Sequence, residues 1–269
     1  MSDDKPLALV TGASSGIGFE LAKQLAERGF DLVVNAEDEA RLQQVAEQIG
    51  AEGAQVTAVR ADLRVHQETG MLFATATTLG RPLDVVVLNA GVGRGGAFAD
   101  TDLADELEII DLNIRSTVHL AKRVVRDMVV RGEGRILVTS SIASTMPGSF
   151  QAVYNASKSF LQSFTEALQN ELKDTGITLT CLMPGPTETD FFHRADMDDT
   201  KVGRQDKDDP AQVARQGLDA LFAGKDKVVA GSLKTKAQGL ANKVLPDTAK
   251  AQAHRQMAEP GSGEHKNSD

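Results

Sequence analysis

Short apolar runs rich in β-branched residues alternate with longer segments of helical period along most of this chain. The runs occupy residues 7–10, 31–35, 55–61, 85–88, 136–138, 177–182 and 227–230. Between them, apolar residues recur three and four positions apart over 19–28, 39–49, 67–79, 104–131, 151–173 and 211–222. Strands joined through helical crossovers form parallel sheets with helices on both faces. We therefore expect one doubly wound α/β domain of about seven strands over residues 1–232.

Two segments depart from this alternation. Residues 190–210 are rich in aspartate and contain few apolar anchors, which predicts a solvated, mobile segment. Residues 233–269 form a polar C-terminal extension with helical pieces at 237–245 and 248–257, and we expect its last ten residues to be disordered. The extension could cover a cleft or contact a partner subunit, and the sequence does not choose between them.

Charge and composition exclude several classes of function. The net charge is −9, whereas nucleic-acid binding requires clustered positive charge. The single cysteine, Cys181, excludes an internal disulfide framework, and the five histidines show no metal-ligand spacing, so we expect no metal. No apolar run approaches the roughly 18 residues of a membrane helix, and the N-terminus lacks a signal-peptide pattern. These features predict a cytoplasmic protein with no nucleic-acid or membrane partner.

A glycine-rich run lies at the first strand-to-helix junction, in the spacing G-x-x-x-G-x-G. Small residues let the backbone approach an anion, and the free N–H groups and dipole of a helix start attract a diphosphate. The alternative is a glycine-rich turn with no ligand. The residues expected to bind the diphosphate are Gly12, Ser14, Ser15, Gly16, Ile17 and Gly18.

The only tyrosine, Tyr154, lies four residues before Lys158 on an expected helix, so the two side chains share one face. A free phenol has a pKa of about 10, and a nearby ammonium group would lower it. Ser141 follows a strand, at the edge where doubly wound sheets bind ligands. We expect Ser141 to polarise a carbonyl group while Tyr154 transfers the proton and a nicotinamide transfers the hydride. The alternative is a packing tyrosine beside a solvated lysine.

Together these pieces resemble the short-chain dehydrogenase/reductase family over about residues 7–231. The matching pieces are TGASSGIG at 11–18, Asp62-Leu63, Leu88-Asn89-Ala90-Gly91, Asn113, Ser140-Ser141, Tyr154-Asn-Ala-Ser-Lys158 and Pro184-Gly185. The resemblance implies a Rossmann-type fold and an NAD(P)-dependent oxidoreductase that acts on a secondary alcohol or its ketone. It implies catalytic roles for Ser141, Tyr154 and Lys158, and a place for Asn113 in a water-linked proton relay.

The resemblance also implies further cofactor contacts. Asp62 would accept a hydrogen bond from the adenine amino group, Leu63 would pack beside it, and Lys158 would hold a ribose. Residues 89–91 (Asn89, Ala90, Gly91) would lie against the adenosine ribose and the central strands. After Pro184-Gly185, Thr187 and Thr189 would contact the nicotinamide amide and the diphosphate, with a helix N-cap as their alternative role.

The choice of dinucleotide depends on the residues after the second strand. The 2′-phosphate of NADP needs a cation, whereas the 2′-hydroxyl of NAD suits a carboxylate. Many NADP-preferring relatives carry arginine where Glu37 stands and a basic residue where Ser15 stands, so the sequence favours NAD. The aspartate usual in NAD-specific relatives would fall at Ala36, which leaves NADP open.

The natural substrate cannot be inferred from the sequence beyond a small-molecule alcohol or ketone. In the family, the segment 190–210 covers the substrate cleft, and Phe191, Phe192 and Met197 could form an apolar lid. Further candidates for the pocket wall are Phe98, Met146 and Phe150.

Other functions and an oligomeric state stay open. One alternative function is a non-catalytic dinucleotide sensor, and another is carrier-bound acyl reduction or epimerisation, although no run of Lys/Arg clearly supplies a docking patch. Relatives use the helices corresponding to 104–131 and 151–173 for oligomer packing, so we expect a homodimer or homotetramer. Packing of these helices on the sheet alone is the other interpretation.

Overall fold

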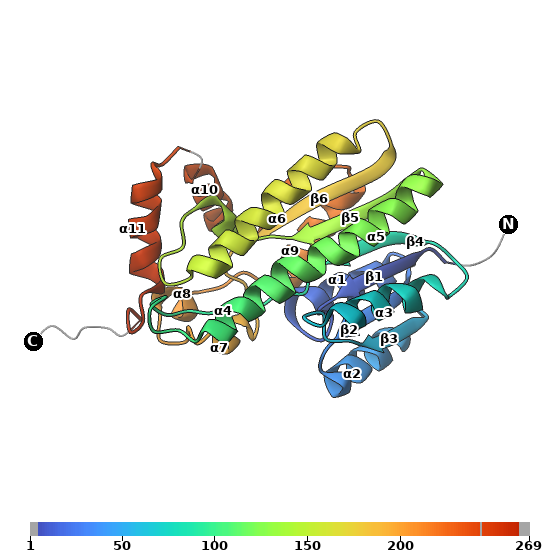
Figure 1. Ribbon diagram of the computed structural model, residues 1–269, viewed down its shortest axis with the longest axis horizontal. Coiled ribbons are helices and arrows are strands. Elements are labelled where there is room, and N and C mark those ends of the chain that lie inside the picture. Colours follow the sequence, from blue (N-terminus) through green and yellow to red (C-terminus); the bar gives the residue numbers. More distant parts are fainter. Residues whose placement is uncertain (1–4, 243, 264–269) are drawn as a thin grey trace, which may run out of the picture.

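The computed structural model describes residues 5–242 and 244–263. Seven strands form one sheet in the order β3-β2-β1-β4-β5-β6-β7, and every neighbouring pair is parallel (Figure 1). The strands are β1 (Leu7–Thr11), β2 (Asp31–Ala36), β3 (Val56–Arg60), β4 (Leu83–Leu88), β5 (Glu133–Thr139), β6 (Gly176–Pro184) and β7 (Lys227–Ala230). The predicted doubly wound sheet of about seven strands is confirmed.

Helices cover both faces of the sheet (Figure 1). On one side lie α1 (Gly16–Glu27), α2 (Glu39–Gly50) and α9 (Pro210–Phe222). On the other side lie α3 (His66–Thr77), α5 (Ser116–Arg131) and α6 (Ala152–Glu171). In the described part of the chain, no helix is both long and apolar enough to cross a membrane.

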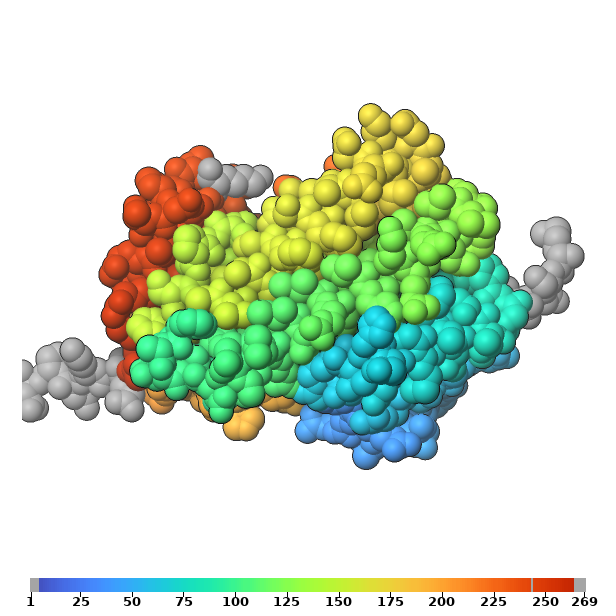
Figure 2. Space-filling model, viewed as in Figure 1, coloured from blue at the N-terminus to red at the C-terminus, as the bar shows by residue number. Residues whose placement is uncertain are grey.

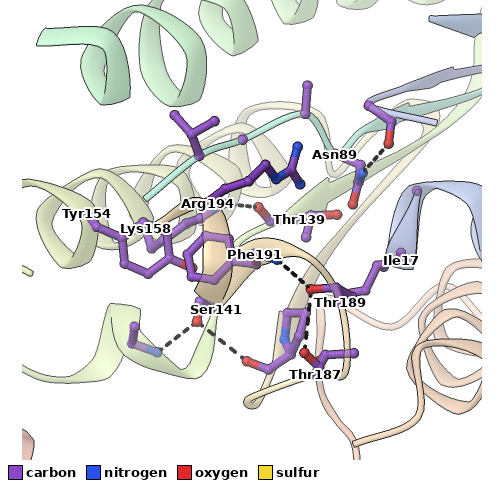
Figure 3. A pocket seen from close by; sticks show the side chains of 18 of the residues that line it. Ile17, Asn89, Thr139, Ser141, Tyr154, Lys158, Thr187, Thr189, Phe191 and Arg194 are labelled. Carbon is purple, nitrogen blue, oxygen red and sulfur yellow. Dashed lines mark hydrogen bonds between the residues drawn. The ribbon is translucent and has the colours of Figure 1, made fainter. Parts of the chain in front are cut away.

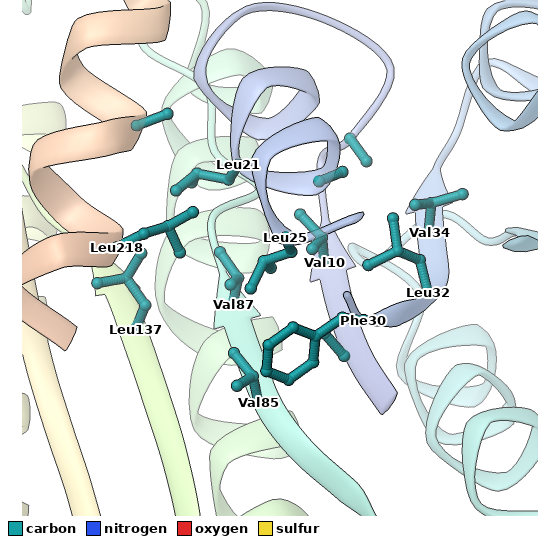
Figure 4. Packing of buried hydrophobic residues seen from close by; sticks show 14 of the residues in the cluster. Val10, Leu21, Leu25, Phe30, Leu32, Val34, Val85, Val87, Leu137 and Leu218 are labelled. Atoms are coloured by element: carbon teal, nitrogen blue, oxygen red, sulfur yellow. The ribbon is translucent and has the colours of Figure 1, made fainter. Parts of the chain in front are cut away.

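The alternation of side chains along each strand builds two separate cores. Along β1, Leu7 and Leu9 enter the cluster under α3, α5 and α6, whereas Ala8 and Val10 enter the cluster under α1, α2 and α9. Figure 4 shows the second cluster, in which Leu25 of α1 packs over the strands. Because both faces are buried, the strands read as continuous apolar runs in the sequence.

The strand order places a switch point between β1 and β4. The chain runs outward from β1 to β2 and β3, and then returns to form β4 on the other side of β1. The two connections after β1 and β4 therefore diverge and leave a crevice at the carboxyl ends of these strands, where doubly wound sheets bind ligands.

The expected helix over 104–131 is three consecutive pieces. These are α4 (Leu103–Ile109), a π-helical stretch η1 (Ile110–Arg115) and α5. A π-helical turn inside a longer helix disturbs the regular backbone hydrogen bonds, and such turns are frequent at functional sites.

The C-terminal extension folds back over one end of the molecule, beside the segment 190–210 (Figures 1 and 2). It contains α10 (Leu233–Ala241) and α11 (Asp247–Ala258), and the segment contains α7 (Phe191–Arg194) and α8 (Lys201–Arg204). Ala258 of α11 joins Phe192 and Met197 in a small buried cluster. Of the last ten residues, for which we expect disorder, 260–263 form hydrogen-bonded turns and 264–269 lie outside the described residues.

Candidate active site

A cavity of about 250 Å³ follows the carboxyl edge of the sheet, and every residue predicted to bind the cofactor lines it. Figure 3 shows part of its wall, including Ile17, Asn89, Thr187 and Thr189. Catalytic candidates Ser141, Tyr154 and Lys158 line the same cavity, whereas Asn113 does not. The predicted cofactor residues in its wall are Gly12, Ser14, Ser15, Gly16, Ile17, Gly18, Glu37, Asp62, Leu63, Asn89, Ala90, Gly91, Pro184, Gly185, Thr187 and Thr189.

The loop before α1 is shaped for an anion. Gly12 and Gly16 adopt φ angles of +66° and +56°, which favour glycine. A Cβ on Gly18 would overlap the carbonyl oxygen of Gly12, so the helix start can lie this close to the strand end only without a side chain. No side chain caps α1 at Ser15, and its first-turn N–H groups therefore remain available to a diphosphate.

At the edge beyond β2 and β3, one arginine holds three carboxylates together. Arg64 forms ion pairs with Glu37, Asp62 and Glu108, and its Nε lies 2.8 Å from Oδ1 of Asp62. Burial alone would raise the pKa of Asp62, but the hydrogen bonds and charge of Arg64 outweigh burial and lower it. Asp62 is therefore held as a carboxylate at this end of the cavity, and Glu37 pairs with the same arginine.

Asn89 and Gly91 join the glycine loop to the catalytic end of the cavity. The Asn89 side-chain amide lies 3.2 Å from the carbonyl oxygen of Thr11 and so fixes the end of β1 against the end of β4. A Cβ on Gly91 would lie 3.1 Å from Oδ1 of Asn113 and 3.3 Å from Nζ of Lys158. Glycine at this position therefore leaves room for both polar groups behind the cavity wall.

Ser141, Tyr154 and Lys158 meet at the carboxyl ends of β5 and β6. Ser141 follows β5, and its hydroxyl group accepts from the backbone N of Ala143 at 3.1 Å; Tyr154 on α6 lines the same cavity wall. Lys158, one turn further along α6, is buried and donates from Nζ to the carbonyl oxygen of Thr139, 3.1 Å away. Its Nζ lies 5.7 Å from the centre of the Tyr154 ring, so the ammonium lies over the ring face.

The predicted lowering of the phenol pKa by Lys158 is wrong in this arrangement. Burial raises the pKa of Tyr154 to about 12, and the hydrogen bond with Ser141 only partly offsets that rise. Burial also lowers the pKa of Lys158 to about 8. Burial dominates both pKa shifts, and Tyr154 is a protonated acid at neutral pH.

Asn113 lies behind the cavity, in the π-helical stretch. Its side chain is fully buried and forms two hydrogen bonds with the backbone of Val92. Oδ1 accepts from the N–H of Val92 and Nδ2 donates to its carbonyl oxygen, each at 2.9 Å. It also donates to Oγ of Ser157 at 3.0 Å. The side chain therefore fixes the loop after β4, and the proposed proton relay stays a prediction for this residue.

The substrate end of the cavity draws on residues that the sequence motifs did not identify. Phe191, Phe192 and Met146 line it as expected. Phe98 is 64% exposed and lies outside the described cavity wall, and Phe150 and Met197 pack against the buried cluster that contains Ala258. The lining residues without a motif are Ile142, Gln151, Arg194, Val202, Gln238, His254 and Met257.

Two of these residues show how the wall is fixed. His254 of α11 bonds through Nδ1 to the carbonyl oxygen of Ser149 at 2.9 Å, and burial lowers its pKa, so the ring is neutral at pH 7. Arg194 of α7 points into the cavity (Figure 3) and forms no ion pair with any residue in the described ranges. The sequence could not identify these two residues, because neither belongs to a motif of recognisable spacing. The fold alone brings them to the cavity.

A nicotinamide dinucleotide fits the groups present. The glycine cradle and helix start suit the diphosphate, and the carboxylates beyond β2 suit a ribose. At the catalytic end, the buried hydroxyl group of Thr139 lines the cavity and has no hydrogen-bond partner within the described ranges. Such a polar atom is satisfied when a ligand supplies the partner.

Oxidoreductases that use a nicotinamide dinucleotide are the class of enzyme that this fold and this cavity define. More narrowly, residues 6–200 match the family model described as short chain dehydrogenase, and the chain belongs to that family.

Named relatives and solved structures agree with this assignment. The chain is 36% identical over 192 residues to a putative ketoacyl reductase of Streptomyces coelicolor, covering 70% of this chain and 73% of that protein. It is 33% identical over 189 residues to dehydrogenase/reductase SDR family member 4 of Bos taurus, covering 70% and 68% of the two chains. Among solved structures, a Sphingobium yanoikuyae short-chain dehydrogenase in complex with NADPH superposes with a TM-score of 0.77 at 29% identity, over 83% of this chain and 87% of that one.

Proposed function

We propose that this enzyme transfers a hydride between a nicotinamide dinucleotide and a secondary alcohol or its ketone, with Ser141, Tyr154 and Lys158 as the catalytic groups. The observation that carries the proposal is the meeting of Ser141, Tyr154 and Lys158 in the wall of one cavity, beside the residues expected to bind the dinucleotide.

In the direction of reduction, the residues have separate tasks. When bound, a reduced nicotinamide dinucleotide would supply the hydride chemistry at the carbonyl carbon. The hydroxyl group of Ser141 donates a hydrogen bond to the carbonyl oxygen, and the Tyr154 phenol gives its proton to that oxygen as negative charge develops there. An alkoxide is a much stronger base than a phenolate, so this proton transfer is favourable even with the high phenol pKa of about 12. The nearby Lys158 ammonium then stabilises the phenolate that is left.

Substitution of the phenol tests the proposal. Tyr154→Phe retains the ring that packs against Phe191 with centroids 5.2 Å apart, but it removes the proton. Turnover in a screen of alcohols and ketones should fall by roughly three orders of magnitude, while calorimetric titration should show dinucleotide binding largely unchanged. Unchanged turnover would exclude Tyr154 as the acid.

We further propose NAD as the preferred dinucleotide. Glu37 lines the cavity, and the cation that pairs with it, Arg64, is shared among three carboxylates. The cluster of Glu37, Asp62, Glu108 and Arg64 is therefore negative overall, which suits a ribose hydroxyl group and repels a 2′-phosphate.

We also propose assembly into a homodimer or homotetramer through α4, α5 and α6. Large apolar side chains are exposed along these helices, which form one broad face of the molecule (Figure 2). Examples are Leu103, Leu107, Val118 and Phe160, with exposed fractions of 67%, 49%, 36% and 39%. Exposed apolar surface of this kind is typical of subunit contacts.

A further inference from the structure

A second, open groove begins where the substrate end of the cavity reaches the surface. Gln238 and Met257 line both, so the groove continues the cavity outward. The described residues that line this groove include three cations and no carboxylate, and we call it the basic groove. Its lining residues are Lys201, Arg204, Gln205, Lys234, Gln238, Met257 and Gly263.

The guanidinium group of Arg204 is held in place without losing its charge. Its Nε donates to the carbonyl oxygen of Asp198 at 3.0 Å, and NH1 donates to the carbonyl oxygen of Gly263 at 3.2 Å. Backbone carbonyls orient a guanidinium group but do not neutralise it. Arg204 therefore presents a positioned, uncompensated cation to the groove.

Neither Lys201 nor Lys234 forms an ion pair with a residue in the described ranges. Of the carboxylates next to α8, Asp198 pairs with His193 at 2.7 Å, Asp199 accepts from the backbone N of Gly261 at 2.6 Å, and none lines the groove. Among the described residues, the wall of the groove therefore carries three cations and no anion, which favours an anionic ligand.

Between this groove and the catalytic groups, the cavity wall combines apolar side chains with the polar Gln151, Arg194, Gln238 and His254. A substrate that extends from Tyr154 to the groove therefore meets a polar end, a middle with a large apolar surface, and a cationic end. The apolar side chains along this path are Ile142, Met146, Phe191, Phe192, Val202 and Met257.

We propose that the substrate is a carbonyl compound with an apolar chain and an anionic group, a phosphate or a carboxylate, at the end remote from the carbonyl. Lys201, Arg204 and Lys234 bind that anionic group. This inference rests on the proposed function and names the substrate class of the same site. The cations come from α8 and α10, which are separate in sequence, so no Lys/Arg run indicates the groove.

Matched substrate pairs test the inference in the full-length enzyme. A 3-oxoacyl coenzyme A is compared with the same acyl group on neutral N-acetylcysteamine, and a medium-chain oxo acid is compared with its methyl ester. The first pair tests a phosphate source and the second a carboxylate source. The anionic member of at least one pair should have a KM lower by about tenfold, and the difference should shrink as salt rises from 50 to 500 mM.

The double variant Lys201→Gln/Lys234→Gln should abolish most of this difference while leaving the KM of the neutral member unchanged. The matched control is Lys173→Gln/Lys225→Gln, which removes the same charge from exposed positions outside the groove. Arg204 is left intact because its bonds to the backbone support the turn that it anchors.

A binding measurement separates failure of this inference from failure of the proposed function. Calorimetry with coenzyme A and with dodecanoate, at saturating NAD to exclude binding in the dinucleotide site, should show binding that the double variant weakens by about tenfold. If neutral ketones are reduced but neither pair discriminates and neither probe binds, the inference is overturned and the oxidoreductase activity stands. If no carbonyl compound is reduced, the proposed function fails, and the calorimetry still decides whether the groove binds anions.

Discussion

Single side chains give the two ends of the cavity different electrostatic character. At the catalytic end, burial dominates, so the phenol stays protonated and the lysine pKa falls to about 8. At the adenosine end, charge dominates, because Arg64 pairs with Glu37 and Asp62 and lowers the pKa of Asp62. Spacing in the sequence identified Tyr154, Lys158 and Glu37. It could not show that Tyr154 and Lys158 are buried, or that Arg64 pairs with Glu37.

Glu37→Gln should shift the enzyme toward NADP. The substitution removes one of the three carboxylates that share Arg64, so the guanidinium group gains freedom to pair with a 2′-phosphate. We expect the ratio of kcat/KM for NADP over NAD to rise by roughly tenfold. Steady-state kinetics with both dinucleotides at one salt concentration measures the ratio, and Glu39→Gln, which carries an exposed carboxylate outside the cavity, is the control. An unchanged ratio would contradict the role of Glu37.

The activity should fall above about pH 8 in the direction of reduction. The pKa of Lys158 is lowered to about 8 in the folded enzyme, so the ammonium group is present below that pH and is lost as the pH rises through it. Without that charge the Tyr154 phenolate is less stable, so the phenol becomes a poorer acid. A profile of kcat/KM from pH 6 to 10 reports this ionisation in the free enzyme.

Lys158→Met provides the comparison for that profile. It should lower kcat/KM strongly and remove the inflection, because the buried group that titrates near pH 8 is gone. A wild-type profile that stays level from pH 7 to 10 would show that the charge on Lys158 does not matter for the step.

At the scale of whole elements, the tight junction between β1 and α1 shapes the end of the cavity proposed for the diphosphate. Gly18→Ala would place a Cβ against the carbonyl oxygen of Gly12, whose backbone cannot yield easily. We expect a loss of about 1–3 kcal/mol in the free energy of unfolding and much weaker dinucleotide binding, measured by thermal unfolding with and without NAD. Gly50→Ala at the end of α2 meets no atom within 4 Å and should change stability by less than about 1 kcal/mol. Equal effects of the two substitutions would contradict this account.

The elements themselves were largely predictable, for a physical reason. A strand buried on both faces must be apolar throughout, and a helix packed on a sheet must repeat its apolar residues, so all seven strands were located from the sequence. The π-helical stretch at 110–115 was not, because the backbone change that separates it from an α-helix leaves no periodic signal. The position of α11 beside the cavity was also hidden, since His254 and Met257 match no motif.

At the scale of the whole molecule, the apolar face on α4, α5 and α6 predicts an oligomer that charge can disrupt. Val118→Lys combined with Phe160→Lys should place two ammonium groups on the proposed interface and yield monomers in light scattering after size-exclusion chromatography. Leu233→Lys on α10, at 85% exposure and away from this face, is the control. A wild-type enzyme that is already monomeric would exclude this assembly.

The outer wall of the cavity comes from α10 and α11, and a ribosome synthesises these helices after all other parts of the described cavity. A nascent chain that has emerged as far as β7 therefore already contains the dinucleotide cradle and the catalytic side chains, but lacks His254 and Met257. Cofactor capture can consequently precede substrate selection during synthesis. Selectivity for the carbonyl compound would then be acquired last, as the final helices close over a domain that is already folded.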